Sequence, residues 1–111
     1  MNREIQQKIE DLEDDFKIKM ESLKNEYSKV DNLEKEVSKE CDETYERIMY
    51  LKQNKGFVYI SNDQLSRILE RYSDETKESC NRARCFINES IENMERYYAS
   101  KIKEIEESVF Q

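Results

Sequence analysis

Hydrophobic residues in the first half of the chain recur every three or four positions. This spacing places them on one face of a helix and is incompatible with a strand. The residues between them are mostly Glu, Lys, Asp, Gln and Ser, and most of these are good helix formers. The pattern predicts one amphipathic helix over residues 3–53. Its apolar face holds Ile5, Ile9, Leu12, Phe16, Met20, Leu23, Tyr27 and Val30, and continues less regularly through Leu33, Val37, Cys41, Tyr45, Ile48 and Leu51.

The first predicted helix ends at a short polar break. Residues 53–55 lead to Gly56, the only glycine in the chain, and glycine readily adopts the left-handed conformation that closes helices. An apolar run follows that is too short to form a sheet. We expect it to be an extended connector that packs against the end of the helix pair. The run consists of Phe57, Val58, Tyr59 and Ile60.

A capping signal marks the start of a second helix. Ser61 and Gln64 are spaced as a capping box, in which each side chain bonds the backbone N–H of the other. Ile60 before the cap and Leu65 inside the helix have the spacing of a hydrophobic staple. Together with the periodicity that follows, these signals predict a helix over 62–109.

The second hydrophobic series becomes an eleven-residue repeat from Cys80 onward, with Cys80, Ile91 and Ile102 at one position of the repeat. Eleven residues over three turns are close to the relaxed helix, so little left-handed supercoil is expected. The whole series is Leu65, Leu69, Tyr72, Thr76, Cys80, Ala83, Ile87, Ile91, Met94, Tyr98, Ile102, Ile105 and Val109.

Two long helices joined by a short connector predict an all-α fold, an antiparallel two-helix hairpin that forms a single domain over 1–111. Counting outward from the turn sets Tyr45 against Tyr72. The same register places Cys80 among the residues that face Val37 and Cys41.

Several large apolar residues lie off these two helical faces. A two-helix hairpin has little interior of its own, and one or two exposed apolar residues would be ordinary. A set of this size predicts a second interface, and we expect assembly into a four-helix bundle with a second copy or with another helical protein. The residues are Ile18, Val58, Ile68, Phe86, Tyr97 and Phe110, with Tyr50 and Tyr59 near the turn.

Composition and charge narrow the class of function. The 111 residues are 41% charged and 36% hydrophobic and include no Pro, which excludes sheet folds that need many turns. The net charge of −7 leaves no basic stripe for nucleic acid or for an anionic membrane surface. No apolar run approaches the length of a membrane span, so no membrane insertion is expected. Without a signal-peptide pattern, we expect a cytoplasmic protein, with export independent of a signal peptide left open.

The residue types argue against catalysis. The chain has no His, which removes the commonest general base and metal ligand, and it has no phosphate-binding Gly-rich loop. The three cysteines, Cys41, Cys80 and Cys85, have neither zinc-site spacing nor the density of a disulfide framework, so we interpret them as reduced thiols. The expectation is a protein without enzymatic activity, cofactor or metal.

The architecture resembles the small helical-hairpin proteins of type VII secretion, which include the Trp-x-Gly family and the adaptors encoded with LXG toxins. The resemblance covers the whole chain and rests on its length, its two long helices and the Gly-aromatic break at Gly56-Phe57. The turn of the Trp-x-Gly family carries a Trp, and this chain has none. Tyr27-x3-Asp31 and Tyr59-x3-Asp63 match the aromatic-x3-acidic pattern of export signals in that group, although both precede the end of the second helix.

The resemblance implies a non-catalytic adaptor that packs beside a helical region of a client protein, such as a secreted toxin. One alternative is a homodimeric coiled-coil scaffold or spacer. Another is an acidic inhibitor of the immunity-protein type, whose binding would depend strongly on salt. For an adaptor, the expected partner-binding residues are Phe57, Val58, Tyr59, Ile60, Ile68, Phe86 and Tyr97. In a scaffold the same residues would cap the hairpin and fill a homodimer core.

Overall fold

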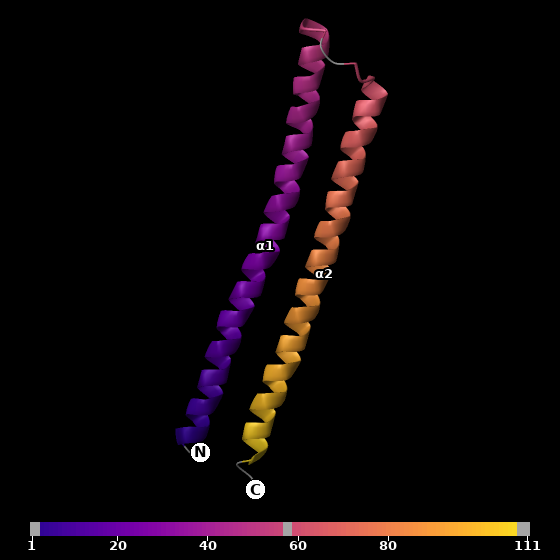
Figure 1. Ribbon diagram of the computed structural model, residues 1–111. Helices are drawn as coiled ribbons and strands as arrows, with labels where there is room; N and C mark the ends of the chain where they lie inside the picture. Colours follow the sequence, from indigo (N-terminus) through magenta and orange to yellow (C-terminus); the bar gives the residue numbers. More distant parts are fainter. Residues whose placement is uncertain (1–2, 57–58, 109–111) are drawn as a thin grey trace. The chain divides into compact units, whose positions relative to one another are not determined.

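The computed structural model describes residues 3–56 and 59–108 and contains, over these ranges, two helices and no strand. Helix α1 spans Arg3–Asn54 and helix α2 spans Asn62–Ser108 (Figure 1). The predicted all-α helical hairpin is confirmed, and the end predicted for the first helix differs from the observed end by one residue. Val109, at the predicted end of the second helix, lies outside the described residues.

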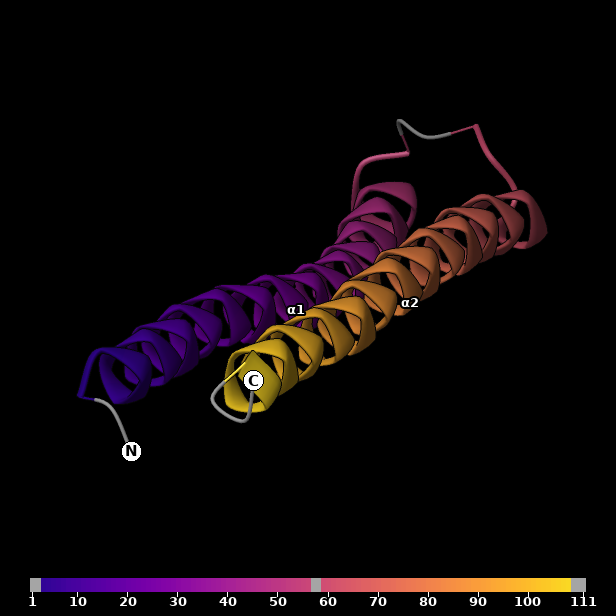
Figure 2. The ribbon, with the colours of Figure 1, turned by 90° about the horizontal axis from the view of Figure 1, so that it is seen from below.

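The chain divides into two compact units, each built from a segment of both helices. The end unit comprises residues 1–28 and 84–111, and the turn unit comprises residues 29–83. Within each unit the segments of α1 and α2 lie side by side (Figure 2). The residues that face the other helix within a unit are called its inner face below.

The inner face of the end unit follows the predicted series. Ile87 and Tyr98 are buried, and every other predicted position from Ile5 to Tyr27 and from Ile91 to Ile105 is half-buried. The Phe16 ring lies 5.4 Å from the Tyr98 ring, centroid to centroid, at an interplanar angle of 52°. Tilted aromatic pairs at this distance are attractive beyond their buried area, so this pair helps to hold the two segments together.

The ends of both helices at the turn are closed as the sequence predicts. Gly56 has a φ of 63°, and its amide donates to the Leu51 carbonyl over 2.9 Å, which satisfies a carbonyl at the end of α1. At the start of α2 the Ser61 amide donates to Gln64 Oε1, and the Gln64 amide donates to Ser61 Oγ, each over 3.1 Å. The capping box is therefore confirmed.

The connector is held by a lysine at the end of α1. Lys52 Nζ donates to the Ile60 carbonyl over 2.6 Å and to Asn62 Oδ1 over 2.7 Å. Ile60 is half-buried, whereas Tyr59 is 97% exposed. The prediction that this run packs against the helix end is wrong for Tyr59, because the Lys52 bonds anchor the backbone without burying that side chain. Phe57 and Val58 lie outside the described residues.

The inner face of the turn unit departs from the predicted series at three positions, one of which is the exposed Tyr45. Leu33 and Tyr72 are exposed, and the half-buried positions beside them belong to Glu34 and Ser73. Helical spacing explains these other two differences, because a step of four residues leads from Val30 to Glu34 and from Leu69 to Ser73. Large apolar side chains therefore stand one position off the inner face of this unit.

Within the turn unit the register also differs from the predicted one. Cys80 Sγ lies 4.0 Å from the carbonyl oxygen of Val30, about two helical turns away from the predicted neighbour Val37. Tyr45 lines a cleft with Ser66 and Leu69 rather than pairing with Tyr72. In the turn unit the pairing of the two helices is therefore displaced from the register obtained by counting outward from the turn.

Candidate functional site

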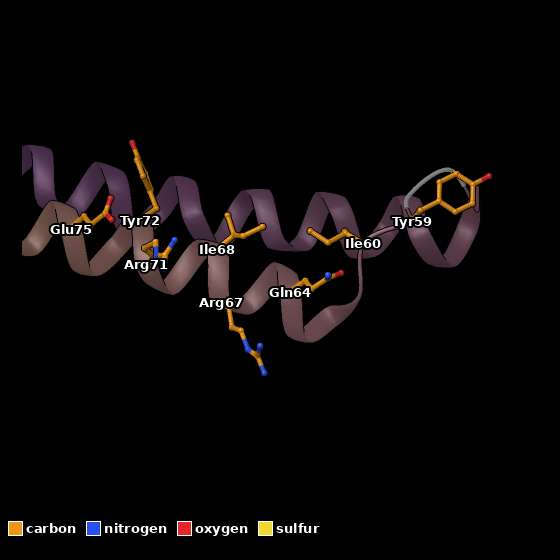
Figure 3. A pocket seen from close by; sticks show the side chains of 8 residues that line it. All are labelled: Tyr59, Ile60, Gln64, Arg67, Ile68, Arg71, Tyr72 and Glu75. Atoms are coloured by element: carbon orange, nitrogen blue, oxygen red, sulfur yellow. The ribbon is translucent and has the colours of Figure 1, made fainter.

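A groove runs along the first turns of α2 in the turn unit (Figure 3). Its volume is about 1070 Å³. Apart from two connector residues, its lining comes from one side of α2, so the groove is open to solvent along its length. We call it the α2 groove. It is lined by Tyr59, Ile60, Gln64, Arg67, Ile68, Arg71, Tyr72 and Glu75.

One row of the α2 groove is apolar. Ile68 is 56% exposed and Tyr72 is 49% exposed, and their spacing of four residues makes them neighbours on the helix surface. The sequence places them here because Leu65 and Leu69 already occupy the inner face, where Leu65 is 3% exposed and Leu69 is half-buried. Ile68 and Tyr72 project from α2 in a different direction from Leu65 and Leu69. They therefore cannot face α1 while these two leucines do.

A second row of the α2 groove is basic. Arg67 and Arg71 are also four residues apart, and each directly precedes a member of the apolar row. Among the residues that the structure describes, neither arginine forms an ion pair. The charge of this row is opposite to the net charge of −7 of the whole chain, which makes it a local feature of α2.

Two other polar residues, Gln64 and Glu75, stand at the ends of the groove. Gln64 Oε1 already accepts the Ser61 amide in the capping box, so this side chain is fixed at the connector end. Glu75 is the only acidic residue of the lining and stands at the opposite end. The rows of Arg67/Arg71 and Ile68/Tyr72 therefore dominate the chemistry of the groove.

A smaller cleft of about 280 Å³ lies elsewhere in the turn unit, between α1 and α2. It exists because the inner face is filled there by small side chains, Ser73 and Cys41, both half-buried. The cleft reflects incomplete packing of the turn unit.

The predicted site residues Phe86 and Tyr97 belong to the end unit. Phe86 is 70% exposed. Tyr97 is also exposed, but its ring packs edge-on against Tyr98 at 5.2 Å, and Lys101 Nζ lies 5.7 Å from its centroid. Tyr97 is thus partly engaged within its own unit, whereas Phe86 has no aromatic contact among the described residues.

A polar cluster connects α1 and α2 in the end unit. Tyr98 Oη accepts a hydrogen bond from Lys19 Nζ over 2.9 Å and donates one to the Asp15 carboxylate, and Lys19 Nζ lies 3.2 Å from Asp15 Oδ2. The Tyr98 hydrogen bond, followed by the Lys19 bond, lowers the pKa of Asp15 from its ordinary 3.8. The Tyr98 hydrogen bond and then Asp15 raise the pKa of Lys19 from its ordinary 10.5. Both ionised forms are thereby favoured.

The described residues offer no metal centre. No group of three or more Cys, Asp or Glu side chains among them is arranged to hold a metal ion. The three thiols are free, with Cys80 buried, Cys41 half-buried and Cys85 exposed. Over the described ranges, neither α1 nor α2 contains a stretch long and apolar enough to cross a membrane.

The structure brings together only some of the predicted site residues. Tyr59, Ile60 and Ile68 line the α2 groove, while Phe86 and Tyr97 are part of the end unit. Phe57 and Val58 lie outside the described residues. Sequence reasoning missed five groove residues, although an Arg-x3-Arg pair beside an Ile-x3-Tyr pair is visible in the sequence. The missed residues are Gln64, Arg67, Arg71, Tyr72 and Glu75.

Comparison of the chain with protein-family models, curated proteins and solved structures finds no match.

Proposed function

We propose that this protein is a non-catalytic helical adaptor that binds a helical region of a partner protein through the α2 groove. The observation that carries the proposal is the exposed pair Ile68 and Tyr72 in an open groove. A partner helix can lay an apolar stripe into such a groove. Along α2 the groove extends from Gln64 to Glu75, about three helical turns, which suits a helix as occupant.

The energetics support binding in the turn unit. Burying apolar surface contributes roughly 25 cal/mol per Å², and the turn unit leaves six large hydrophobic side chains exposed among its described residues. When a partner covers several of these side chains, their burial would stabilise the complex. The residues are Leu33, Tyr45, Tyr50, Tyr59, Ile68 and Tyr72.

The resemblance to type VII secretion hairpins gives the proposal a more specific form. In that form the client is the helical N-terminal region of a secreted toxin, and the adaptor accompanies it to the secretion machinery. Support for this version is the helical-hairpin architecture, formed by α1 and α2.

The first test is the mass of the purified chain by multi-angle light scattering over a wide concentration range. An adaptor is expected to be monomeric, or to associate weakly, and to gain thermal stability when a candidate helical client is added, because a ligand of the folded state stabilises it by mass action. A tight homodimer whose melting temperature rises with its own concentration would contradict the adaptor and favour the homodimeric scaffold.

A further inference from the structure

We propose that the occupant of the α2 groove is an acidic amphipathic helix of a different protein, with carboxylates that pair with Arg67 and Arg71. This inference rests on the proposed adaptor function and specifies the chemistry of the partner. The required helix carries two Asp or Glu residues four positions apart, beside two apolar residues also four positions apart.

The two rows of the groove lie side by side along α2. Adjacent residues of a helix are separated by about 100°, so Arg67 and Arg71 form one edge of the groove and Ile68 and Tyr72 the other. Figure 3 shows Arg67 and Tyr72 pointing to opposite sides of α2. A partner helix lying on the apolar row would contact Ile68 and Tyr72 directly, and its acidic side chains would reach around α2 to the arginines.

The basic row is available for a partner. Asp63 and Glu75 stand four residues from Arg67 and Arg71 respectively, at a spacing that permits ion pairs within a helix. The structure instead leaves both arginines without an ion pair among the described residues. By contrast, Arg82 and Arg96 on the same helix pair with Glu78 and Glu92, at 3.0 and 3.5 Å. A guanidinium binds a carboxylate through two parallel N–H groups, which makes an acidic pair the matching chemistry.

A second copy of the chain fits this groove poorly. Two α2 helices related by a two-fold axis perpendicular to them run antiparallel, and each row then faces the same row of the other copy. Arg67 and Arg71 would meet arginines. A two-fold axis along the helices makes them parallel and sets the arginines against Ile68 and Tyr72. Neither symmetric arrangement satisfies both rows, whereas an acidic helix satisfies both.

The test uses two synthetic amphipathic peptides that share one apolar face and differ only in a Glu pair or a Lys pair beside it. Their binding to the full chain is measured by fluorescence anisotropy at low salt. Two exposed ion pairs of ordinary strength should make the Glu peptide bind about tenfold more tightly than the Lys peptide. High salt should reduce this preference. The variant Arg67→Glu/Arg71→Glu should reverse it.

The matched control is Lys35→Glu/Lys39→Glu on α1. It changes two exposed cations at the same spacing and alters the net charge equally, so it should leave the preference for the Glu peptide intact. Circular dichroism of each variant establishes that the helices are retained. A preference lost equally in the control and the groove variant would reflect overall charge and overturn the proposal.

Three further results would also overturn the acidic partner, and they separate it from the adaptor function. If both peptides bind equally and Ile68→Ser/Tyr72→Ser abolishes both, the adaptor stands and the acidic partner falls. If neither peptide binds and the chain is a monomer, the groove does not take such a helix. If the chain is a tight homodimer that Ile68→Ser/Tyr72→Ser dissociates, the occupant is a second copy and both proposals fall.

Discussion

The end unit and the turn unit are built from the same two helices, yet they bury their hydrophobic residues differently. In the end unit the large hydrophobic residues follow the inner face, and three of those described are exposed, Ile18, Phe86 and Tyr97. In the turn unit six are exposed, and half-buried inner positions are taken by Glu34 and Ser73. A displacement of one position along the helix is therefore enough to leave Leu33 and Tyr72 exposed instead of packed between the helices.

The difference suggests a division of roles. The end unit holds α1 and α2 together through the Phe16 and Tyr98 rings and through the Asp15–Lys19–Tyr98 cluster. The turn unit contains the α2 groove and the smaller cleft. Variants that affect one unit and spare the other test this division.

The largest effect is expected at the centre of the end unit. Tyr98→Ala removes a buried ring and the hydroxyl that bonds Asp15 and Lys19, and should lower the free energy of unfolding by about 3–5 kcal/mol. Tyr98→Phe keeps the ring and should cost about 1 kcal/mol. Urea unfolding followed by circular dichroism measures both. Equal losses for the two variants would show that the ring contributes little.

A smaller loss is expected at the cap of α2. Ser61→Ala removes the hydroxyl that accepts the Gln64 amide and should lower the free energy of unfolding by about 1 kcal/mol. Ser66→Ala, an exposed position inside the same helix, is the control and should be neutral or slightly stabilising, since Ala is the better helix former. Urea unfolding of the pair shows whether the cap itself matters.

Filling the cleft should improve the internal packing of the turn unit and so stabilise the protein. Ser73→Leu places an apolar side chain at a half-buried position that lines the cleft and should raise the free energy of unfolding by about 1 kcal/mol. Ser79→Leu, at an exposed position of α2, should have little effect. A loss of stability in Ser73→Leu alone would mean that the inner face there has no room.

The groove residues should contribute least to folding. Ile68→Ser/Tyr72→Ser changes two side chains that are exposed in the chain alone, so the free energy of unfolding should change by no more than about 0.5 kcal/mol per site. Thermal unfolding measures this. A large destabilisation would show that the row serves the hairpin's own fold.

The pH dependence of stability should reflect the cluster of the end unit. Because the pKa of Asp15 is lowered in the fold, its contribution is present above 3.8 and is lost as the pH falls through the folded value. Because the pKa of Lys19 is raised, its contribution is present below 10.5 and is lost as the pH rises through the folded value. Melting temperatures measured across pH should show shallower slopes at both extremes in Tyr98→Phe. Identical slopes would contradict a role for the tyrosine hydroxyl.

Only the smaller part of the candidate site could be predicted from sequence, and its basic row could not. Ile68 and Tyr59 stand out as apolar residues off the helical pattern, and both line the groove. Arg67 and Arg71 do not stand out, because a charged residue on a helix is ordinarily solvated. The periodic pattern placed Tyr72 on the inner face, but the structure exposes it. This exposure is what shows that a basic row lies next to an apolar one.

The sequence by itself determined the helices and their ends, because helix propensity, the period of hydrophobic residues and capping are local properties. Gly56 and the Ser61–Gln64 capping box fix where α1 and α2 meet the connector. The tertiary structure alone decided which of two adjacent residues faces the other helix, as with Tyr72 and Ser73. That choice depends on how each helix is rotated about its axis, and the rotation is set by packing between residues far apart in sequence, such as Cys80 against Val30.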